Sequence, residues 1–192
     1  MNAVIFDLDG TLWDTSAEVV KCWNKTLEKL NTGKSIDKSL ISSFMGKTND
    51  EIISLFLSEF KYEEACKIFS ELSKNESEYL KIHGAKLYKD VEKTLKILYP
   101  KYKLCIVSNC QLSYLEAFLS HYDFYEFFED YECEGRTKRS KGENIKTIIS
   151  RNKFEKAIYV GDTLSDQKAC EYANVPFVYA SYGFSIPIFG KC

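Results

Sequence analysis

Apolar residues along the chain form two kinds of pattern, short continuous runs and stripes at helical spacing. Runs that suit a buried strand occur at 3–6, 103–107, 157–160 and 176–179, and 130–133 suits a shorter strand. From residue 86 onward these runs alternate with amphipathic stretches. Such alternation is typical of α/β proteins, because right-handed crossovers place helices on the faces of a parallel sheet. We therefore expect a doubly wound parallel sheet, with intervening helices at 91–99, from about 113 onward, at 142–151 and at 166–173.

Residues 15–83 interrupt this rhythm. They carry charged residues at helical spacing and almost no β-rich run. Val19, Trp23 and Leu27, for example, fall on one face of a helix. We expect three helices there, at 17–30, 52–60 and 64–80. The sequence thus predicts an all-helical insertion at 15–83, between the two parts of an α/β core at 1–14 and 84–192.

Two of the predicted strands end in carboxylates. Asp7 and Asp9 follow the run at 3–6, and Asp162 and Asp166 follow the run at 157–160. Ligands of parallel α/β sheets bind outside the carboxyl ends of the strands. Clustered carboxylates repel one another unless a cation lies between them, and Mg²⁺ in phosphate sites takes one or two carboxylates. Each segment alone has an alternative interpretation as a solvated turn that caps a helix. The two segments together favour a site.

These residues carry a resemblance to a known family. The segment from Asp7 to Thr11, Asp-Leu-Asp-Gly-Thr, resembles the first motif of the haloacid dehalogenase (HAD) superfamily, in which most members with this form are phosphatases. Ser108, after an apolar run, resembles the second motif, and Lys141 falls where the third motif has its lysine. Asp162 and Asp166 match the acidic pair of the fourth motif. The match covers about residues 3–183, and four motifs in order are highly specific.

The resemblance implies a role for each carboxylate of the first motif. Asp7 would be the nucleophile that is transiently phosphorylated, as in other aspartyl-phosphate enzymes. Asp9 would be the general acid that protonates the leaving oxygen and then the base that activates water. Dehalogenases of this superfamily characteristically lack the second aspartate, so Asp9 favours phosphoryl chemistry.

The resemblance also implies a metal and a phosphate site. Mg²⁺ would be held by Asp7, Asp162 and the backbone carbonyl of Asp9. Asp166 would support the metal indirectly, through a bound water or by orienting one of these ligands. Ser108 and Lys141 would bind the phosphoryl oxygens.

Three further residues are weaker candidates. Thr11 and Asn109 are candidates to donate hydrogen bonds to the phosphate. Ordinary hydrogen bonds in turns and helix caps would explain the presence of these residues equally well. Lys47 lies in a loop of the insertion that contacts substrate in related phosphatases. Its alternative is a solvated lysine.

Composition narrows the class of partner and the compartment. The 192 residues include 26 basic and 28 acidic side chains, for a net charge of −2, which argues against nucleic-acid binding. Seven cysteines without a C-x-x-C pair fit a reducing compartment. No apolar run approaches the roughly 18 residues of a membrane span, and Met1 leads directly into the first strand. We expect a cytoplasmic protein, monomer or homodimer.

The sequence therefore predicts a Mg²⁺-dependent phosphatase of a small phosphorylated metabolite, most similar to the phosphoglycolate-phosphatase-like branch of the superfamily. Three alternatives stay open. One is a phosphomutase of the β-phosphoglucomutase type, and another is a phosphatase of sugar phosphates or nucleotides. The third is a non-catalytic module that binds a phosphorylated ligand; intact motif residues speak against it.

Overall fold

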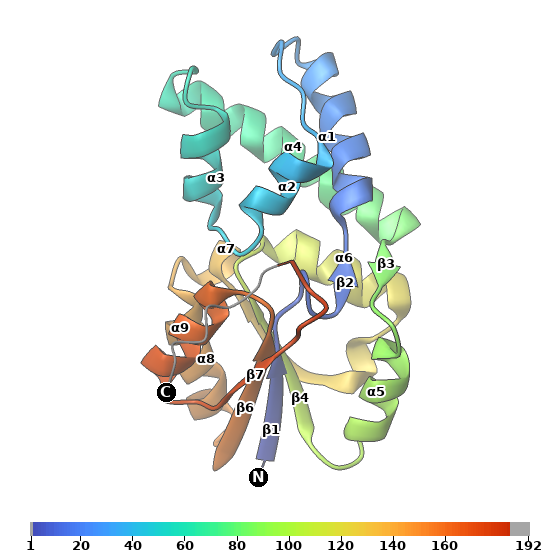
Figure 1. The fold of residues 1–192 in the computed structure, drawn as a ribbon, viewed down its shortest axis with the longest axis vertical. Helices are drawn as coiled ribbons and strands as arrows, with labels where there is room; N and C mark the ends of the chain where they lie inside the picture. Colours follow the sequence, from blue (N-terminus) through green and yellow to red (C-terminus); the bar gives the residue numbers. More distant parts are fainter. Residues whose placement is uncertain (1, 185–192) are drawn as a thin grey trace.

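A five-stranded parallel sheet forms the centre of the computed structural model, which describes residues 2–184 (Figure 1). The strand order is β5-β4-β1-β6-β7, and all four pairings are parallel. The strands are β1 (Asn2–Phe6), β4 (Lys103–Ser108), β5 (Phe128–Cys133), β6 (Lys156–Gly161) and β7 (Phe177–Tyr179). The predicted α/β class with a doubly wound parallel sheet is confirmed.

The central strand of the sheet is β1, which pairs with β4 on one side and β6 on the other. Phe6, its last residue, is in register with Ile106 of β4 and Val160 of β6. The chain builds one half of the sheet from β1 outward and then returns to build the other half. Ligands of open α/β sheets bind at such a reversal point. The carboxyl ends of β1, β4 and β6 therefore meet at the edge where a site is expected.

Alternating residues of β1 face opposite layers of helices. Val4 and Phe6 belong to an apolar cluster with α5 (Val91–Leu98) and α6 (Leu112–Tyr122). Ala3 and Ile5 pack instead with α8 (Lys141–Arg151) and α9 (Leu164–Ala173). Two short elements flank β5, the 3-10 turn η1 (Tyr125–Phe127) and α7 (Glu134–Thr137). A strand buried on both faces reads as a continuous apolar run, which explains the clear sequence signal.

Four helices form a separate layer over the carboxyl edge of the sheet (Figure 1). They are α1 (Ser16–Lys29), α2 (Lys38–Phe44), α3 (Asn49–Phe56) and α4 (Tyr62–His83), here called the helical layer. Its apolar cluster centres on Trp23, whose ring lies 6.4, 6.1 and 6.0 Å from the rings of Phe44, Phe56 and Phe69. The layer thus has its own core, formed by the stripes that the sequence shows.

The helix predicted at 52–60 differs from the observed helix. It begins earlier, because Thr48 and Glu51 form a capping box, and it ends at Phe56 in a turn where the N–H of Phe60 bonds to Leu57. The sequence analysis also missed α2. This helix has seven residues, and the Asp37 carboxylate caps it by accepting from the N–H of Leu40 at 2.8 Å. A helix of this length is too short to show a clear apolar stripe.

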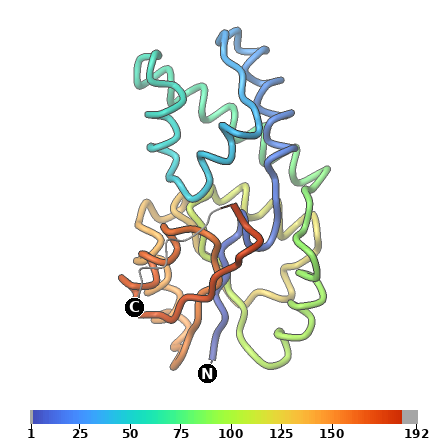
Figure 2. Tube along the Cα trace, viewed as in Figure 1, coloured from blue at the N-terminus to red at the C-terminus, as the bar shows by residue number. Residues whose placement is uncertain are grey.

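The chain passes twice between the sheet and the helical layer (Figure 2). The two passages include β2 (Trp13–Asp14) and β3 (Lys86–Leu87), which pair as antiparallel strands that the sequence analysis did not predict. They lie beside the limits of the predicted insertion, and the division of the chain into two domains there stays a prediction.

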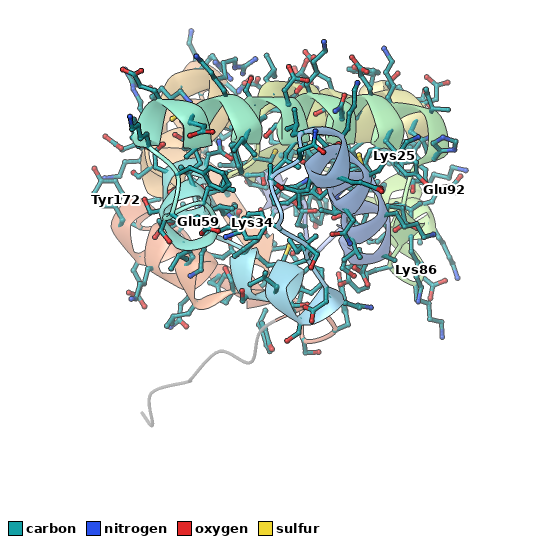
Figure 3. The ribbon with its side chains drawn as sticks, turned by 90° about the horizontal axis from the view of Figure 1, so that it is seen from above. Lys25, Lys34, Glu59, Lys86, Glu92 and Tyr172 are labelled. Atoms are coloured by element: carbon teal, nitrogen blue, oxygen red, sulfur yellow. The ribbon has the colours of Figure 1, made fainter. Side chains whose placement is uncertain are left out.

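An ion pair links two loops of the helical layer. Lys34 Nζ lies 2.5 Å from Glu59 Oε2 and 5.0 Å from the centre of the Phe56 ring; both charged residues are labelled in Figure 3. A pair of this kind at the surface contributes little to stability, because water screens the two charges.

Among residues 2–184, no helix combines the length and the apolar character that a membrane crossing requires.

Candidate active site

Asp7 and Asp9 extend from the end of β1 in a tight turn. The N–H of Asp7 still pairs with the carbonyl of Val160 at 2.8 Å, and the N–H of Leu12 then donates to the carbonyl of Leu8 at 2.8 Å. Gly10 completes the turn with a φ of 82°. A Cβ at Gly10 would collide with the carboxylate of Asp162. Glycine is therefore required there for both its backbone conformation and its size.

Three buried carboxylates meet beside this turn. One oxygen each from Asp7, Asp162 and Asp166 lies within 4.8 Å of the others, and the residues are 3%, 0% and 0% exposed. Burial, with repulsion from its two neighbours, holds the pKa of Asp7 well above its usual range. Burial is also the main cause that raises the pKa of Asp162 to about 6. The cluster is therefore short of positive charge.

Lys141 supplies one positive charge to the cluster. Its Nζ lies 2.9 Å from Asp7 Oδ1 and 2.6 Å from Asp166 Oδ1. Although burial disfavours the ammonium, the two carboxylates raise its pKa above the ordinary value. Lys141 begins α8, where Ser140 and Glu143 form a capping box. The helix start thus fixes the backbone position of the lysine.

The two carboxylates of the fourth motif differ in their partners. Asp166 is saturated: one oxygen binds Lys141 and the other accepts from the N–H and hydroxyl of Thr163 at 2.9 and 2.7 Å. Burial raises the pKa of Asp166, but Lys141 and Thr163 outweigh it, so the pKa lies below its usual range. Asp162 instead accepts one bond, from the N–H of Phe184 at 2.7 Å. Its buried Oδ1 has no hydrogen-bond partner within residues 2–184.

This arrangement suits a hard divalent cation. Carboxylate oxygens are the ligands that Mg²⁺ prefers, and a buried carboxylate oxygen without a partner costs free energy unless a cation or donor meets it. Asp162 Oδ1 is such an oxygen, and Asp7 lies in the same cluster. The saturated Asp166 fits the predicted supporting position better than a direct one.

Asp9 lies in a different environment from Asp7. Its Oδ1 accepts from the hydroxyl of Tyr114 at 2.5 Å and from that of Thr15 at 3.3 Å. Burial raises the pKa of Asp9 to about 6, against the opposing effect of these hydrogen bonds. A carboxyl with this pKa exchanges its proton near neutral pH, as a general acid must. The sequence analysis did not identify Tyr114 or Thr15, because nothing local in the sequence links a helical tyrosine to a carboxylate 105 residues away.

A change at Tyr114 tests the proton-transfer role that the sequence analysis predicts for Asp9. In Tyr114→Phe the carboxylate of Asp9 loses its strongest donor, so its pKa rises. Loss of one hydrogen bond to a charged group is about 1.5–3 kcal/mol, or roughly one to two pKa units. We expect the alkaline limb of log(kcat/KM) at saturating Mg²⁺ to move upward by about that amount. Tyr125→Phe, at an exposed position, is the control and should leave the limb at its native pH. If Tyr114→Phe also left it unchanged, the limb would report the titration of a group other than Asp9.

A cavity of about 100 Å³ joins these groups to the helical layer. Asp7, Asp9, Ser108, Asn109 and Lys141 line it from the sheet edge, and Lys47 lines it from the loop between α2 and α3. The structure therefore brings most of the predicted site residues to one cavity. Three predicted residues are not among those that line this cavity: Asp162, Asp166 and Thr11. All three are buried.

Asn109 has a partner that the sequence did not suggest. Its Nδ2 donates to the carbonyl of Gly46 at 3.0 Å, which ties the end of β4 to the loop that carries Lys47. A second bond between the layers joins Asn49 Nδ2 and Glu134 Oε2 at 3.3 Å. The roles predicted for Asn109 and Thr11 in phosphate binding stay predictions.

Known proteins resemble this chain over nearly its whole length. The sequence profile of the haloacid dehalogenase-like hydrolases matches residues 4–180. A phosphoglycolate phosphatase of Aquifex aeolicus is 27% identical over 96% of this chain and 86% of its own, and one of Colwellia psychrerythraea is 26% identical with the same coverage. A crystal structure described as a putative haloacid dehalogenase-like hydrolase from Bacteroides fragilis is 25% identical, with a TM-score of 0.82 over 96% of this chain and 89% of that chain. A predicted phosphoglycolate phosphatase from Haemophilus somnus, 21% identical over 97% of this chain and 88% of that chain, has the same fold with a TM-score of 0.83.

A parallel α/β sheet with a cluster of carboxylates at the ends of its strands is typical of a class of hydrolases that act on phosphate esters. The chain belongs to the haloacid dehalogenase-like hydrolase family. Its membership in this family and the names of its relatives confirm the expectation of a phosphatase.

Proposed function

We propose that this protein is a Mg²⁺-dependent phosphatase of small phosphorylated metabolites that works through a phosphorylated Asp7. The observation that supports this most strongly is the pairing of two unlike carboxyls in one cavity. Asp7 contacts Lys141 within a buried acidic cluster, whereas Asp9 has a pKa of about 6 and contacts a tyrosine. Carboxyls in unlike environments can divide the roles of nucleophile and acid.

The proposed reaction has two steps. In the first, an Asp7 oxygen attacks phosphorus, the bond from phosphorus to the ester oxygen breaks, and Asp9 gives its proton to that oxygen. In the second, Asp9 takes a proton from water as the water oxygen attacks the same phosphorus, and the bond to Asp7 breaks. Inorganic phosphate leaves, and both carboxyls return to their starting states.

Other residues would stabilise the negative charge on the oxygens of the phosphoryl group during transfer. Ser108 at the end of β4 and Lys141 at the start of α8 line the cavity and would donate to the phosphoryl oxygens. Asp7, Asp162 and the backbone carbonyl of Asp9 would hold Mg²⁺, which supplies positive charge to the phosphoryl oxygens. Asp166 positions Lys141 through the 2.6 Å ion pair.

We also propose that the helical layer is a cap that closes over the substrate. Lys47 lines the cavity from this layer, and the bond between Asn109 and Gly46 joins the layer to the sheet edge. Closure of such an element excludes water and selects substrate. Lys47 would then contact the substrate from the cap.

Phosphate release from a panel of metabolite esters, with Mg²⁺ or with EDTA, tests the proposal. We expect turnover in Mg²⁺ and a loss of about 10³-fold or more in EDTA, because a metal in such a site contributes several kcal/mol of charge stabilisation. Restoring Mg²⁺ to the chelated protein should restore the rate. Slow hydrolysis with a persistent phosphoenzyme would favour a mutase. Absence of both from folded protein would favour a phospho-ligand-binding module.

A further inference from the structure

The end of the cavity farthest from the sheet is mostly apolar. Its walls come from the helical layer and include Val19, Ile41, Phe44, Ile52 and Phe69. A carboxyl group, that of Glu76 on α4, lines the same cavity as Asp7 and Asp9. Neither the proposed mechanism nor the motifs of the family use this glutamate. An acidic side chain in an apolar wall costs free energy unless a partner satisfies it.

Protein cations do not provide that partner. Among residues 2–184, Glu76 forms no ion pair, and the basic side chains that line the cavity are Lys47 and Lys141. Lys141 is already bound to Asp7 and Asp166. Three acidic side chains, Asp7, Asp9 and Glu76, therefore line the cavity. Of the two lysines that line it, only Lys47 is not already paired with the carboxylate cluster.

A second polar group in this wall lacks a partner. Trp23 is 4% exposed and lines the cavity, and its buried Nε1–H has no hydrogen-bond acceptor of good geometry in the part of the chain that the structure describes. It lies close enough to Glu76 to oppose the rise of that carboxyl's pKa. A buried donor without a well-placed acceptor costs free energy. The wall therefore presents a poorly satisfied donor beside an acid that no protein cation neutralises in the described part of the chain.

We propose that Glu76 determines substrate specificity by accepting a hydrogen bond from a hydroxyl or ammonium group on the leaving alcohol. Trp23 Nε1–H would donate to the oxygen of such a hydroxyl. The site would therefore prefer phosphate esters of neutral or cationic alcohols to esters of hydroxy acids, with phosphoglycolate among the disfavoured ones. This inference rests on the proposed phosphatase function and narrows its substrate class.

The protonation of Glu76 supports this preference. Burial, with a contribution from Asp9, raises its pKa to about 8, so at neutral pH the carboxyl mostly holds its proton. A hydroxyl can pair with either form of the carboxyl, and an ammonium favours the ionised form. A substrate carboxylate would instead share one proton with Glu76 and leave a net negative charge in apolar surroundings, which is costly.

Esters that differ in one terminal group provide the test. The probes are ethyl, 2-hydroxyethyl, 2-aminoethyl and carboxymethyl phosphate, with glycerol 3-phosphate and propyl phosphate as a longer pair. We expect kcat/KM for the hydroxyl and amino esters to exceed that of the matching alkyl ester by about 10-fold or more, because a bound alkyl ester leaves the Glu76 carboxyl and the Trp23 Nε1–H without a polar partner. The carboxymethyl ester should be the poorest substrate.

Variants then assign the preference to these residues. Glu76→Leu should bring the hydroxyl-to-alkyl ratio close to one, and Glu76→Gln should keep the hydroxyl preference but lose the amino preference. Trp23→Phe should lower the ratio for the hydroxyl ester alone, because an ammonium cannot accept a hydrogen bond. Glu71→Gln, an exposed site on the same helix, is the matched control.

Two results would overturn the inference: a preference of the native protein for carboxymethyl phosphate, or equal losses on all esters in Glu76→Leu. Binding of the same esters to Asp7→Asn, measured by calorimetry, separates this inference from the proposed function. If no ester is hydrolysed but binding shows the Glu76-dependent ratios, the phosphatase proposal fails and the specificity inference holds. If all esters are hydrolysed without these ratios, the phosphatase proposal holds and the specificity inference fails.

Discussion

Asp7→Asn is expected to lose at least about 10⁴-fold in phosphate release at saturating Mg²⁺, by analogy with the removal of other catalytic nucleophiles. The amide has the same shape as the carboxylate but cannot form the aspartyl-phosphate, and the substitution also removes a ligand from the proposed Mg²⁺ site. Rapid acid quench of the native enzyme, followed by mass spectrometry, should find a phosphorylated peptide that contains Asp7. The variant should lack this peptide.

Asp50→Asn is a suitable control for this experiment, because Asp50 is exposed on α3 and lies outside the cavity lining. It should retain native turnover. Circular dichroism should show that Asp7→Asn is folded, since the amide keeps the volume of the buried side chain. Substantial turnover by a folded Asp7→Asn protein would mean that water attacks the ester directly or that another residue is the nucleophile.

Lys141→Gln is expected to reduce both stability and turnover. The lysine binds Asp7 and Asp166 at 2.9 and 2.6 Å in a fully buried cluster. Removal of one partner from a buried ion pair costs about 3–5 kcal/mol, because the remaining charges stay buried without compensation. Turnover should fall by about 10²-fold or more, as expected for loss of a group that stabilises the transition state. Denaturant unfolding in EDTA measures the first effect.

The sign of the pH dependence follows from the carboxylates that Lys141 leaves behind. In the native protein burial raises the pKa of Asp7, and the Lys141 ammonium opposes this rise. In Lys141→Gln the ammonium is absent, so the pKa of Asp7 rises further. A group with a raised folded-state pKa destabilises the protein increasingly as pH rises above its unfolded value. The stability deficit of Lys141→Gln should therefore be larger at pH 8 than at pH 5. Added Mg²⁺ should reduce it, because the cation supplies charge to the same cluster.

Lys156→Gln, at an exposed position at the start of β6, provides the control for charge removal alone. It should unfold with nearly native free energy at both pH values, since exposed charges contribute little. If Lys141→Gln unfolded like this control, the buried ion pairs would contribute nothing net to stability. Asp7 would then be held mainly in its neutral form.

Much of the fold could be predicted because its central strands, β1 and β4, are buried on both faces. β1, β4 and β6 read as apolar runs, and their ends carry the carboxylates that become neighbours when the strands align. The helical layer was predictable as a helical region but not in its boundaries. The start of α3 depends on the capping box of Thr48 and Glu51, and α2 depends on the single cap Asp37.

The environment of each site residue depended on contacts that no local pattern reveals. Asp162 and Asp166 have the same chemistry in the sequence, yet Thr163 and Lys141 saturate one while the other keeps a buried oxygen without a partner. Tyr114 approaches Asp9 because α6 packs over the end of β1. Glu76 enters the cavity because its face of α4 turns toward the sheet.

Local sequence patterns were enough to predict the parallel sheet, the order of the motifs and the acidic groups at two strand ends. These features are local, since a buried strand needs a continuous apolar run and a strand end is marked by the polar residues that follow it. The folded structure was needed to show which carboxyls have a raised pKa, which oxygen lacks a partner and which residues of the helical layer line the cavity. Each of these depends on burial and on charges brought together from distant parts of the chain, and the pKa of a group is set by those surroundings.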